Sequence, residues 1–197
     1  MDHPMPYSKH HKQQSKERIL DSAVDLFCRK GFDNVSIDDL MEEAELTRGA
    51  FYAHFSSKGD VYMQSITQAS KNTDLIKEIP DGMKSKPLLE YFINGYLSER
   101  HVDQEISPCP MAFLVNDVAN RDPKVKKTYG NVFEGFVKMI EENLSESKST
   151  NENEQLAYAI SALAIGTVAI ARSIEDKTLQ KRLLMNNKQF AINVIDQ

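Results

Sequence analysis

The sequence predicts an all-α fold of about nine helices, with a small three-helix domain at the N-terminus and a larger helical domain behind it. Glycine is scarce, at 8 of 197 residues, and residues that favour helices are frequent. Apolar residues repeat at helical spacing in nearly every segment from residue 14 onward. The 41% hydrophobic and 27% charged residues are ordinary for a globular protein with a packed core.

The first helix is predicted from about residue 14 to residue 30. Gly31 follows the last apolar repeat, where a residue in the left-handed conformation commonly ends a helix. Cys28 lies on the apolar stripe of this helix and is predicted to be a core residue. The other members of the stripe are Ile19, Leu20, Ala23, Val24, Leu26 and Phe27.

Two short helices and a longer one are predicted next. Ser36 is a suitable N-cap, and Asp39 stands three residues later, as in a capping box. Thr47 and Ser57 are predicted to cap the second short helix and the longer helix. Short helices bury little surface alone, so these two must pack on their long neighbours.

The rest of the chain contains further amphipathic helices separated by polar or proline-containing breaks at residues 78–87 and 145–154. Pro108 and Pro110 set the entry to one helix, and the pair Asp122-Pro123 begins the next. The last two predicted helices are an apolar one over residues 156–171 and an amphipathic one ending near Ile195. We therefore predict two domains, residues 14–60 and 61–197.

The charge distribution favours a specific rather than an indiscriminate nucleic-acid partner. The net charge is −5, yet residues 46–58 contain Arg48, His54 and Lys58 and no acid. A second basic segment precedes the first predicted helix and contains Lys9, His10, His11, Lys12, Lys16 and Arg18 against the single acid Glu17. Such local basic segments suit a protein that recognises a particular site, because bulk charge would hold it on DNA poorly.

Residues 36–58 have the arrangement of a helix-turn-helix, whose second helix enters the major groove of DNA. In the predicted recognition helix, residues 48–54, the aromatic residues Phe51 and Phe55 face the core and the polar groups face outward. Arg48 suits a bidentate contact with a guanine edge, and Gly49 permits close approach. The remaining candidate DNA contacts are Thr47, Tyr52, His54 and Lys58. Each residue alone has an ordinary structural explanation, but their agreement favours double-stranded DNA as partner.

The stretch KERILDSAVDLFCRKGFDNVS and its continuation SIDDLMEEAELTRGAFYAHFSSKGDVY resemble the signature of the TetR (tetracycline-repressor) family. The resemblance covers about residues 14–62, and Gly59 departs from it where such proteins usually have an acid or another helix former. It implies base reading by Arg48 and its neighbours and phosphate contacts from Tyr52, His54 and Lys58. It also implies a homodimeric repressor that a small-molecule effector releases from a palindromic operator. The residues that carry it are Thr47-Arg48-Gly49, Phe51-Tyr52-x-His54-Phe55 and Ser57-Lys58.

The C-terminal part is expected to supply a dimer interface and an effector pocket. The apolar helix over residues 156–171 must be buried on more than one face, either as a core helix or, as the resemblance implies, against a second copy. The expected interface residues are Leu156, Ile160, Leu163, Thr167, Ile170, Leu183 and Phe190. A cavity for a small, largely apolar effector is expected among residues that would equally well fill a core, namely Phe92, Tyr96, Met111, Phe113, Phe133, Phe136 and Met139.

Cys109 supports an alternative interpretation, a regulator that senses oxidants or electrophiles. It lies between two prolines near a predicted helix N-terminus, where the helix dipole favours a thiolate, although a small buried residue fits the same place. A nucleophilic enzyme would also need a base, and His101 is the only histidine outside the first sixty residues. We expect no enzyme. A helical effector-binding protein that does not read DNA is a third interpretation, and the intact face of residues 48–58 disfavours it.

No pattern indicates a cofactor or a metal site, and neither a CxxC pair nor a secretion signal is present. The apolar run over residues 156–171 is shorter than the roughly 20 residues that span a membrane easily. We therefore expect a cytoplasmic protein without a membrane partner.

Overall fold

The computed structural model describes residues 9–145 and 149–196, which contain twelve helices and no strand. The all-α prediction is confirmed, but the count of about nine is too low because several breaks contain one-turn helices of their own. In chain order the helices are α1 (Lys9–Lys30), α2 (Ile37–Glu43), α3 (Arg48–Tyr52), α4 (Lys58–Asn72), α5 (Asp74–Lys77), α6 (Ser85–Tyr96), α7 (Glu99–Val102), α8 (Pro110–Phe113), α9 (Val115–Ala119), α10 (Pro123–Glu141), α11 (Thr150–Ala171) and α12 (Lys177–Ile195).

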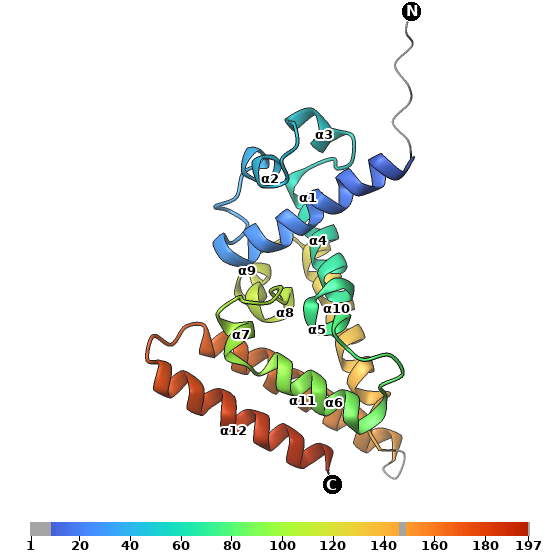
Figure 1. The fold of residues 1–197 in the computed structure, drawn as a ribbon, viewed down its shortest axis with the longest axis vertical. Helices are drawn as coiled ribbons and strands as arrows, with labels where there is room; N and C mark the ends of the chain where they lie inside the picture. The colour runs from blue at the N-terminus through green and yellow to red at the C-terminus, as the bar shows by residue number, and fades with distance from the viewer. Residues whose placement is uncertain (1–8, 146–148, 197) are drawn as a thin grey trace, which may run out of the picture.

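Helices α1, α2 and α3 form one end of the molecule, and α6, α11 and α12 lie side by side at the other end (Figure 1). Helix α4 runs from the first group towards the second and packs against both α1 and α10. It therefore crosses the predicted domain boundary between residues 60 and 61.

The helix ends follow the local signals in the sequence. Gly31 has a φ of 76° and its N–H donates to the Phe27 carbonyl, so it ends α1 as predicted. Ser36 and Asp39 form the predicted capping box, in which Ser36 Oγ accepts from the Asp39 N–H at 3.0 Å. Asp122 accepts from two backbone N–H groups and begins α10 as predicted.

Two helices begin earlier than predicted. Helix α1 already includes Lys9, so the basic segment expected before it lies on its first turns. Helix α11 begins at Thr150 rather than near residue 156, because Ser149 and Glu152 form a second capping box. The expectation about a secretion signal falls partly on residues 1–8, which lie outside the described residues.

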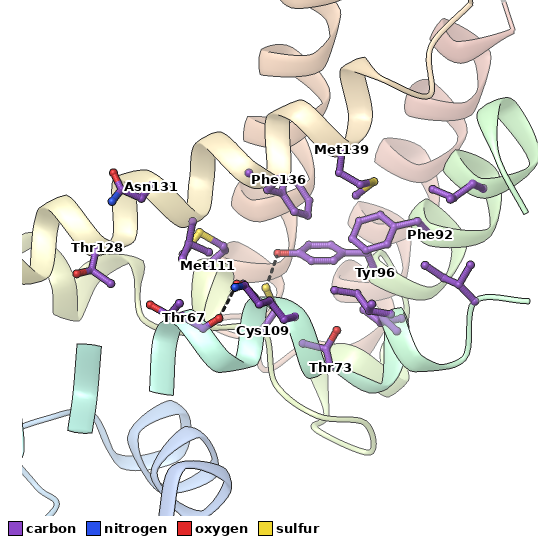
Figure 2. Close-up of a pocket in the computed structure, with 18 residues that line it drawn as sticks. Thr67, Thr73, Phe92, Tyr96, Cys109, Met111, Thr128, Asn131, Phe136 and Met139 are labelled. Atoms are coloured by element: carbon purple, nitrogen blue, oxygen red, sulfur yellow. Dashed lines mark hydrogen bonds between the residues drawn. The ribbon is translucent and has the colours of Figure 1, made fainter. Parts of the chain in front are cut away.

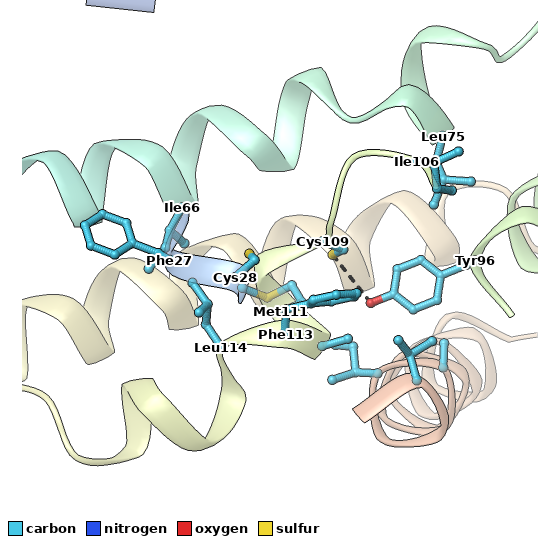
Figure 3. Packing of buried hydrophobic residues seen from close by; sticks show 14 of the residues in the cluster. Phe27, Cys28, Ile66, Leu75, Tyr96, Ile106, Cys109, Met111, Phe113 and Leu114 are labelled. Carbon is cyan, nitrogen blue, oxygen red and sulfur yellow. Dashed lines mark hydrogen bonds between the residues drawn. The ribbon is translucent and has the colours of Figure 1, made fainter. Parts of the chain in front are cut away.

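The buried core is continuous between the two ends of the molecule. Figure 3 shows Phe27 and Cys28 of α1, Ile66 of α4, Met111 of α8 and Tyr96 of α6 within one cluster. Burial of Cys28 confirms its predicted core position. The cluster therefore joins α1 to α6 through α4 and α8.

Helix α11 is long and apolar enough to cross a membrane by length and composition alone. Within its most apolar window, 44% of the residues are buried inside the structure, where α11 packs against α8, α10 and α12. A core helix of a soluble protein has these same properties. The helix is therefore weak grounds for a membrane span.

Candidate nucleic-acid interface and cavity

Helices α2 and α3 are joined by a tight turn over residues 44–47. The Leu46 N–H donates to the Met41 carbonyl and the Glu45 N–H to the Glu42 carbonyl, which closes α2 as a Schellman motif. Glu45 takes the left-handed position, with a φ of 51°. Arg18 of α1 donates to the Ala44 carbonyl at 2.5 Å, so the turn is held on the long helix as predicted for a helix-turn-helix.

The two faces of α3 divide as the sequence predicts. Phe51 of α3 and Phe55, three residues beyond its end, are buried in the small core, whereas Tyr52 is 58% exposed. A Cβ added at Gly49 would meet only Thr47 Oγ1, at 3.9 Å, so packing inside the protein does not require a glycine there. Thr47 has the extended backbone of an N-cap, but its hydroxyl makes no capping hydrogen bond, contrary to the prediction.

Helix α3 ends at Tyr52, two residues earlier than expected, and His54 lies beyond its C-cap. Partial burial lowers the pKa of His54, and the nearby charges of Lys12 and Lys16 lower it further. Because the charges of these two lysines act on His54, the basic first turns of α1 must lie close to the end of α3.

Arg48 projects from the first position of α3 and forms an ion pair with Asp38 of α2, with 2.9 Å between Nη1 and Oδ2. Both side chains are more than half exposed, so opening this pair costs little free energy. The guanidinium is therefore held over the exposed surface of the helix-turn-helix and can exchange its carboxylate partner for another acceptor.

Lys58 differs from the sequence-based expectation of a free phosphate-binding ammonium. Its Nζ donates to the Phe32 and Val35 carbonyls, each at 2.8 Å, and lies 4.2 Å from the centre of the Phe32 ring. These contacts attach the start of α4 to the loop between α1 and α2. The sequence could not indicate this role, because it depends on how that loop folds back over α4.

A cavity of about 550 Å³ lies between α4, α5, α6, α8 and α10 (Figure 2). This volume is within the usual range for sites that bind small molecules. Five predicted pocket residues line it: Phe92, Tyr96, Met111, Phe136 and Met139. The other lining residues are Thr67, Ser70, Lys71, Thr73, Leu75, Ile76, Ile79, Leu88, Cys109, Thr128, Asn131, Val132 and Gly135.

The structure places two predicted pocket residues outside this lining. Phe113 packs against His101 and under the Arg172 guanidinium, which lies 3.6 Å from the ring centre. Phe133 faces Tyr158 of α11, with 6.1 Å between the ring centres. Both belong to apolar stripes of the right composition, but the rotation of their helices turns them towards α11 instead of the cavity.

Sequence reasoning missed the polar end of the cavity, formed by Thr67, Ser70 and Lys71 of α4 with Thr128 and Asn131 of α10. The signal was a polar strip at i, i+3 and i+4 on α4, opposite its buried residues. Such a strip ordinarily faces solvent, so the pattern alone does not reveal a cavity beneath it.

Cys109 lines the cavity, and its surroundings fit a small buried residue rather than the thiolate of the alternative interpretation. Its side chain is buried, and the Tyr96 hydroxyl donates to Sγ at 3.5 Å (Figure 3). Burial raises the pKa of the thiol, and this effect exceeds the opposing one of the hydrogen bond. The predicted helix N-terminus exists, but α8 has only four residues.

A polar network joins the helix-turn-helix end to the rest of the molecule. Arg121 donates from both terminal nitrogens to the Asp33 carboxylate, beyond the end of α1, and also to Asp117 Oδ1 at 3.0 Å. Tyr62 of α4 donates to the other oxygen of Asp117. Arg172, the C-cap residue of α11, adds a second link, because its Nη2 donates to the Cys28 carbonyl at 3.3 Å.

Helices α11 and α12 carry several large apolar side chains that are exposed. Ile170 is 55% exposed and Phe190 is 59% exposed, and both were predicted to lie in an interface. Ile160 and Thr167 were predicted there too, but they are buried within their own chain. Further predicted residues, Leu156, Leu163 and Leu183, are half-buried against the core. The exposed apolar residues that the sequence reasoning missed on these two helices are Tyr158, Leu179 and Met185.

Residues 19–63 match the family model for bacterial regulatory proteins of the tetR family. The chain is 27% identical over 171 residues to an uncharacterized HTH-type transcriptional regulator of Lactococcus lactis subsp. lactis, covering 83% of this chain and 86% of that protein. It is 37% identical over 51 residues to IcaR, a negative transcriptional regulator of the biofilm operon icaADBC in Staphylococcus aureus, covering 26% of this chain and 27% of IcaR.

The fold resembles that of the reduced form of E. coli NemR, with a TM-score of 0.71 and 18% sequence identity, over 91% of this chain and 96% of that one.

Proposed function

We propose that this chain, as a DNA-binding transcriptional regulator of the tetR family, binds a palindromic operator as a homodimer and is released by a small, largely apolar effector. We place the operator-binding domain at residues 14–60 and the effector-binding and dimerisation domain at residues 61–197. Its place of action is the cytoplasm. Repression is the sign we favour, because the relative IcaR is named as a negative regulator.

The observation that carries the proposal is the contrast between the buried rings of Phe51 and Phe55 and the exposed side chains of Arg48 and Tyr52. We assign base reading to Arg48 and contacts to the DNA backbone to Thr47, Tyr52 and His54, with Gly49 permitting close approach. Lys58 contributes by holding α4 in place, and a phosphate contact from it would require it to leave two carbonyls.

Dimerisation would bury the apolar outer surface of α11 and α12. A symmetric contact of this kind repeats the same patch on both copies, so residues such as Ile170 and Phe190 would face their counterparts. It would also set the distance between two recognition helices, which a palindromic site requires.

Helix α4 supports coupling between the cavity and the operator. Its first turn is attached to the α1–α2 loop through Lys58, and its last turns contribute Thr67, Ser70 and Lys71 to the cavity wall. An effector that prefers one position of α4 therefore shifts the population of helix-turn-helix orientations.

The decisive experiment is selection of bound sequences from a random duplex pool, followed by affinity measurements on the enriched site. We compare Arg48→Ala with Asp38→Asn, since both remove the same ion pair but only the first removes the guanidinium. Arg48→Ala should relax base preference at one position in each half-site, whereas Asp38→Asn should keep the preference and bind at least as tightly. An equal loss in both variants, or no enriched palindrome from a folded protein, would refute the proposal.

A second candidate function is thiol-based sensing, because Cys109 stands in the wall of the same cavity. Its raised pKa disfavours a fast reaction with oxidants, so we rank this function below effector binding. Treatment with hydrogen peroxide or N-ethylmaleimide, followed by operator binding, separates the two. Loss of binding in the wild type but not in Cys109→Ser would favour the thiol sensor.

A further inference from the structure

The cavity is polarised from end to end. In Figure 2 the labelled residues Thr128, Asn131 and Thr67 lie at one end, and Phe92 and Met139 lie at the other, with Tyr96 and Phe136 between them. Lys71 is the single charged residue among the 18 described residues that line the cavity, and none of those residues is acidic. A ligand that fills the cavity therefore meets apolar surface at one end and a lone cation at the other.

Lys71 is the only side chain of the polar end that can donate but not accept hydrogen bonds. The Thr67, Ser70 and Thr128 hydroxyls already donate to carbonyls of their own helices. Within residues 9–145 and 149–196, no hydrogen bond or ion pair engages the ammonium of Lys71 or the side-chain amide of Asn131. An ammonium is a donor without acceptor capacity, so the natural complement at this end is an acceptor that carries negative charge.

The polar end also meets the helix-turn-helix end of the molecule. Thr67, Lys71 and Thr128 line both this cavity and an adjoining hollow that reaches α1. The hollow carries the acids Glu17 and Asp60 beside Lys16. These two carboxylates disfavour an anion further out, which makes Lys71, between α4 and α10, the favoured position for an anionic group.

We propose that the effector is an amphipathic monoanion, with an apolar or aromatic body among Phe92, Tyr96, Phe136 and Met139 and an acidic head group at Lys71 and Asn131. This inference rests on the proposed function and specifies its ligand. A head group between α4 and α10 would contact α4, which packs against α1 of the helix-turn-helix end. The charge of the ligand would therefore act where the cavity adjoins α1.

Two fluorescent probes test the inference because they differ by one anionic group. They are 8-anilinonaphthalene-1-sulfonate and its neutral counterpart N-phenyl-1-naphthylamine, each titrated into the full chain. Lys71→Gln should weaken binding of the sulfonate about three- to fivefold and leave the neutral probe unchanged. Lys127→Gln, an equal charge change on the exposed part of α10, should alter neither.

Two glycines of α10 show whether the probes occupy the cavity. A Cβ at Gly135 or at Gly130 meets no atom within 4 Å, but only Gly135 lines the cavity. Gly135→Leu should weaken both probes relative to Gly130→Leu.

Suppose that Gly135→Leu weakens binding of the neutral probe, but Lys71→Gln and Lys127→Gln change binding of the sulfonate equally. The head-group assignment is then overturned, and the cavity remains the effector site. If the two glycine variants bind both probes alike, the effector part of the proposed function falls as well. Operator selection tests the DNA-binding part separately.

Discussion

His101 is buried without charge, and this makes stability depend on pH. The ring lies between Tyr96 and Phe113, its Nδ1 bonds to the Tyr96 carbonyl at 2.8 Å, and its Nε2 is buried without a hydrogen-bond partner in the part of the chain that the structure describes. Burial lowers the pKa of His101 from 6.5 to about 4, and the positive charge of Arg172 also lowers it.

The sign follows from proton binding. Between pH 6.5 and pH 4 the unfolded chain binds a proton at this histidine and the folded chain does not, so acid favours unfolding. Each unit of pKa difference is worth about 1.4 kcal/mol, which gives an upper limit of about 3 kcal/mol for the whole interval. Between pH 7 and pH 5 we expect His101 to remove about 2 kcal/mol of stability.

The assay is urea unfolding at pH 7 and pH 5, at one protein concentration, for the wild type, His101→Asn and His101→Phe. The asparagine retains a donor for the Tyr96 carbonyl, and the phenylalanine retains the aromatic volume. The two variants therefore disturb the packing differently, but both lack the titrating imidazole. Both should lose about 2 kcal/mol less than the wild type between the two pH values. Equal losses in all three proteins would show that His101 is not buried in its neutral form.

Three further predictions concern assembly and stability. Phe190→Glu should convert a dimer to monomers in sedimentation velocity. Gln189→Glu adds the same charge one residue away on α12 and should leave the dimer intact. A monomeric wild type would contradict the proposed dimer. Arg121→Ala should lower the free energy of unfolding in urea by roughly 2 kcal/mol, because it leaves the partly buried Asp117 carboxylate without its partner. An unchanged urea midpoint would show that this network does not stabilise the fold. Gly31→Ala should destabilise by about 1 kcal/mol because its φ is positive, while Gly130→Ala in the interior of α10 should stabilise by a similar amount; equal signs in thermal unfolding would contradict the backbone argument.

The features that the sequence predicts well are those decided by neighbouring residues. Ser36 with Asp39 begins α2, and Gly31 ends α1, because caps act within one turn of helix. The start of α11 was equally readable from Ser149 and Glu152, but it was hidden in a stretch of polar residues that suggested a loop.

The features that the sequence misses depend on contacts between distant segments. Phe133 and Phe136 belong to one amphipathic helix, yet only Phe136 lines the cavity, because the rotation of α10 is set by α4 and α11. Lys58 has the right type and position for DNA, but carbonyls of a loop more than twenty residues away occupy its ammonium. Burial of Cys109 against Tyr96 likewise outweighs the helix end that suggested a thiolate.

The passage of α4 through both halves of the molecule limits how the protein can be recombined. A chimera joined at residue 60 would keep the Lys58 contacts, because Lys58 and its two acceptor carbonyls precede the junction, but it would take the rest of α4 and its part of the cavity wall from the other parent. A junction after residue 72 would also keep those contacts. It would, however, move the cavity residues Thr67, Ser70 and Lys71 together with the helix-turn-helix domain. Under the proposed function, ligand preference and operator preference would be partly inherited together. Exchange of C-terminal domains should then succeed most often between parents with matching α4 sequences.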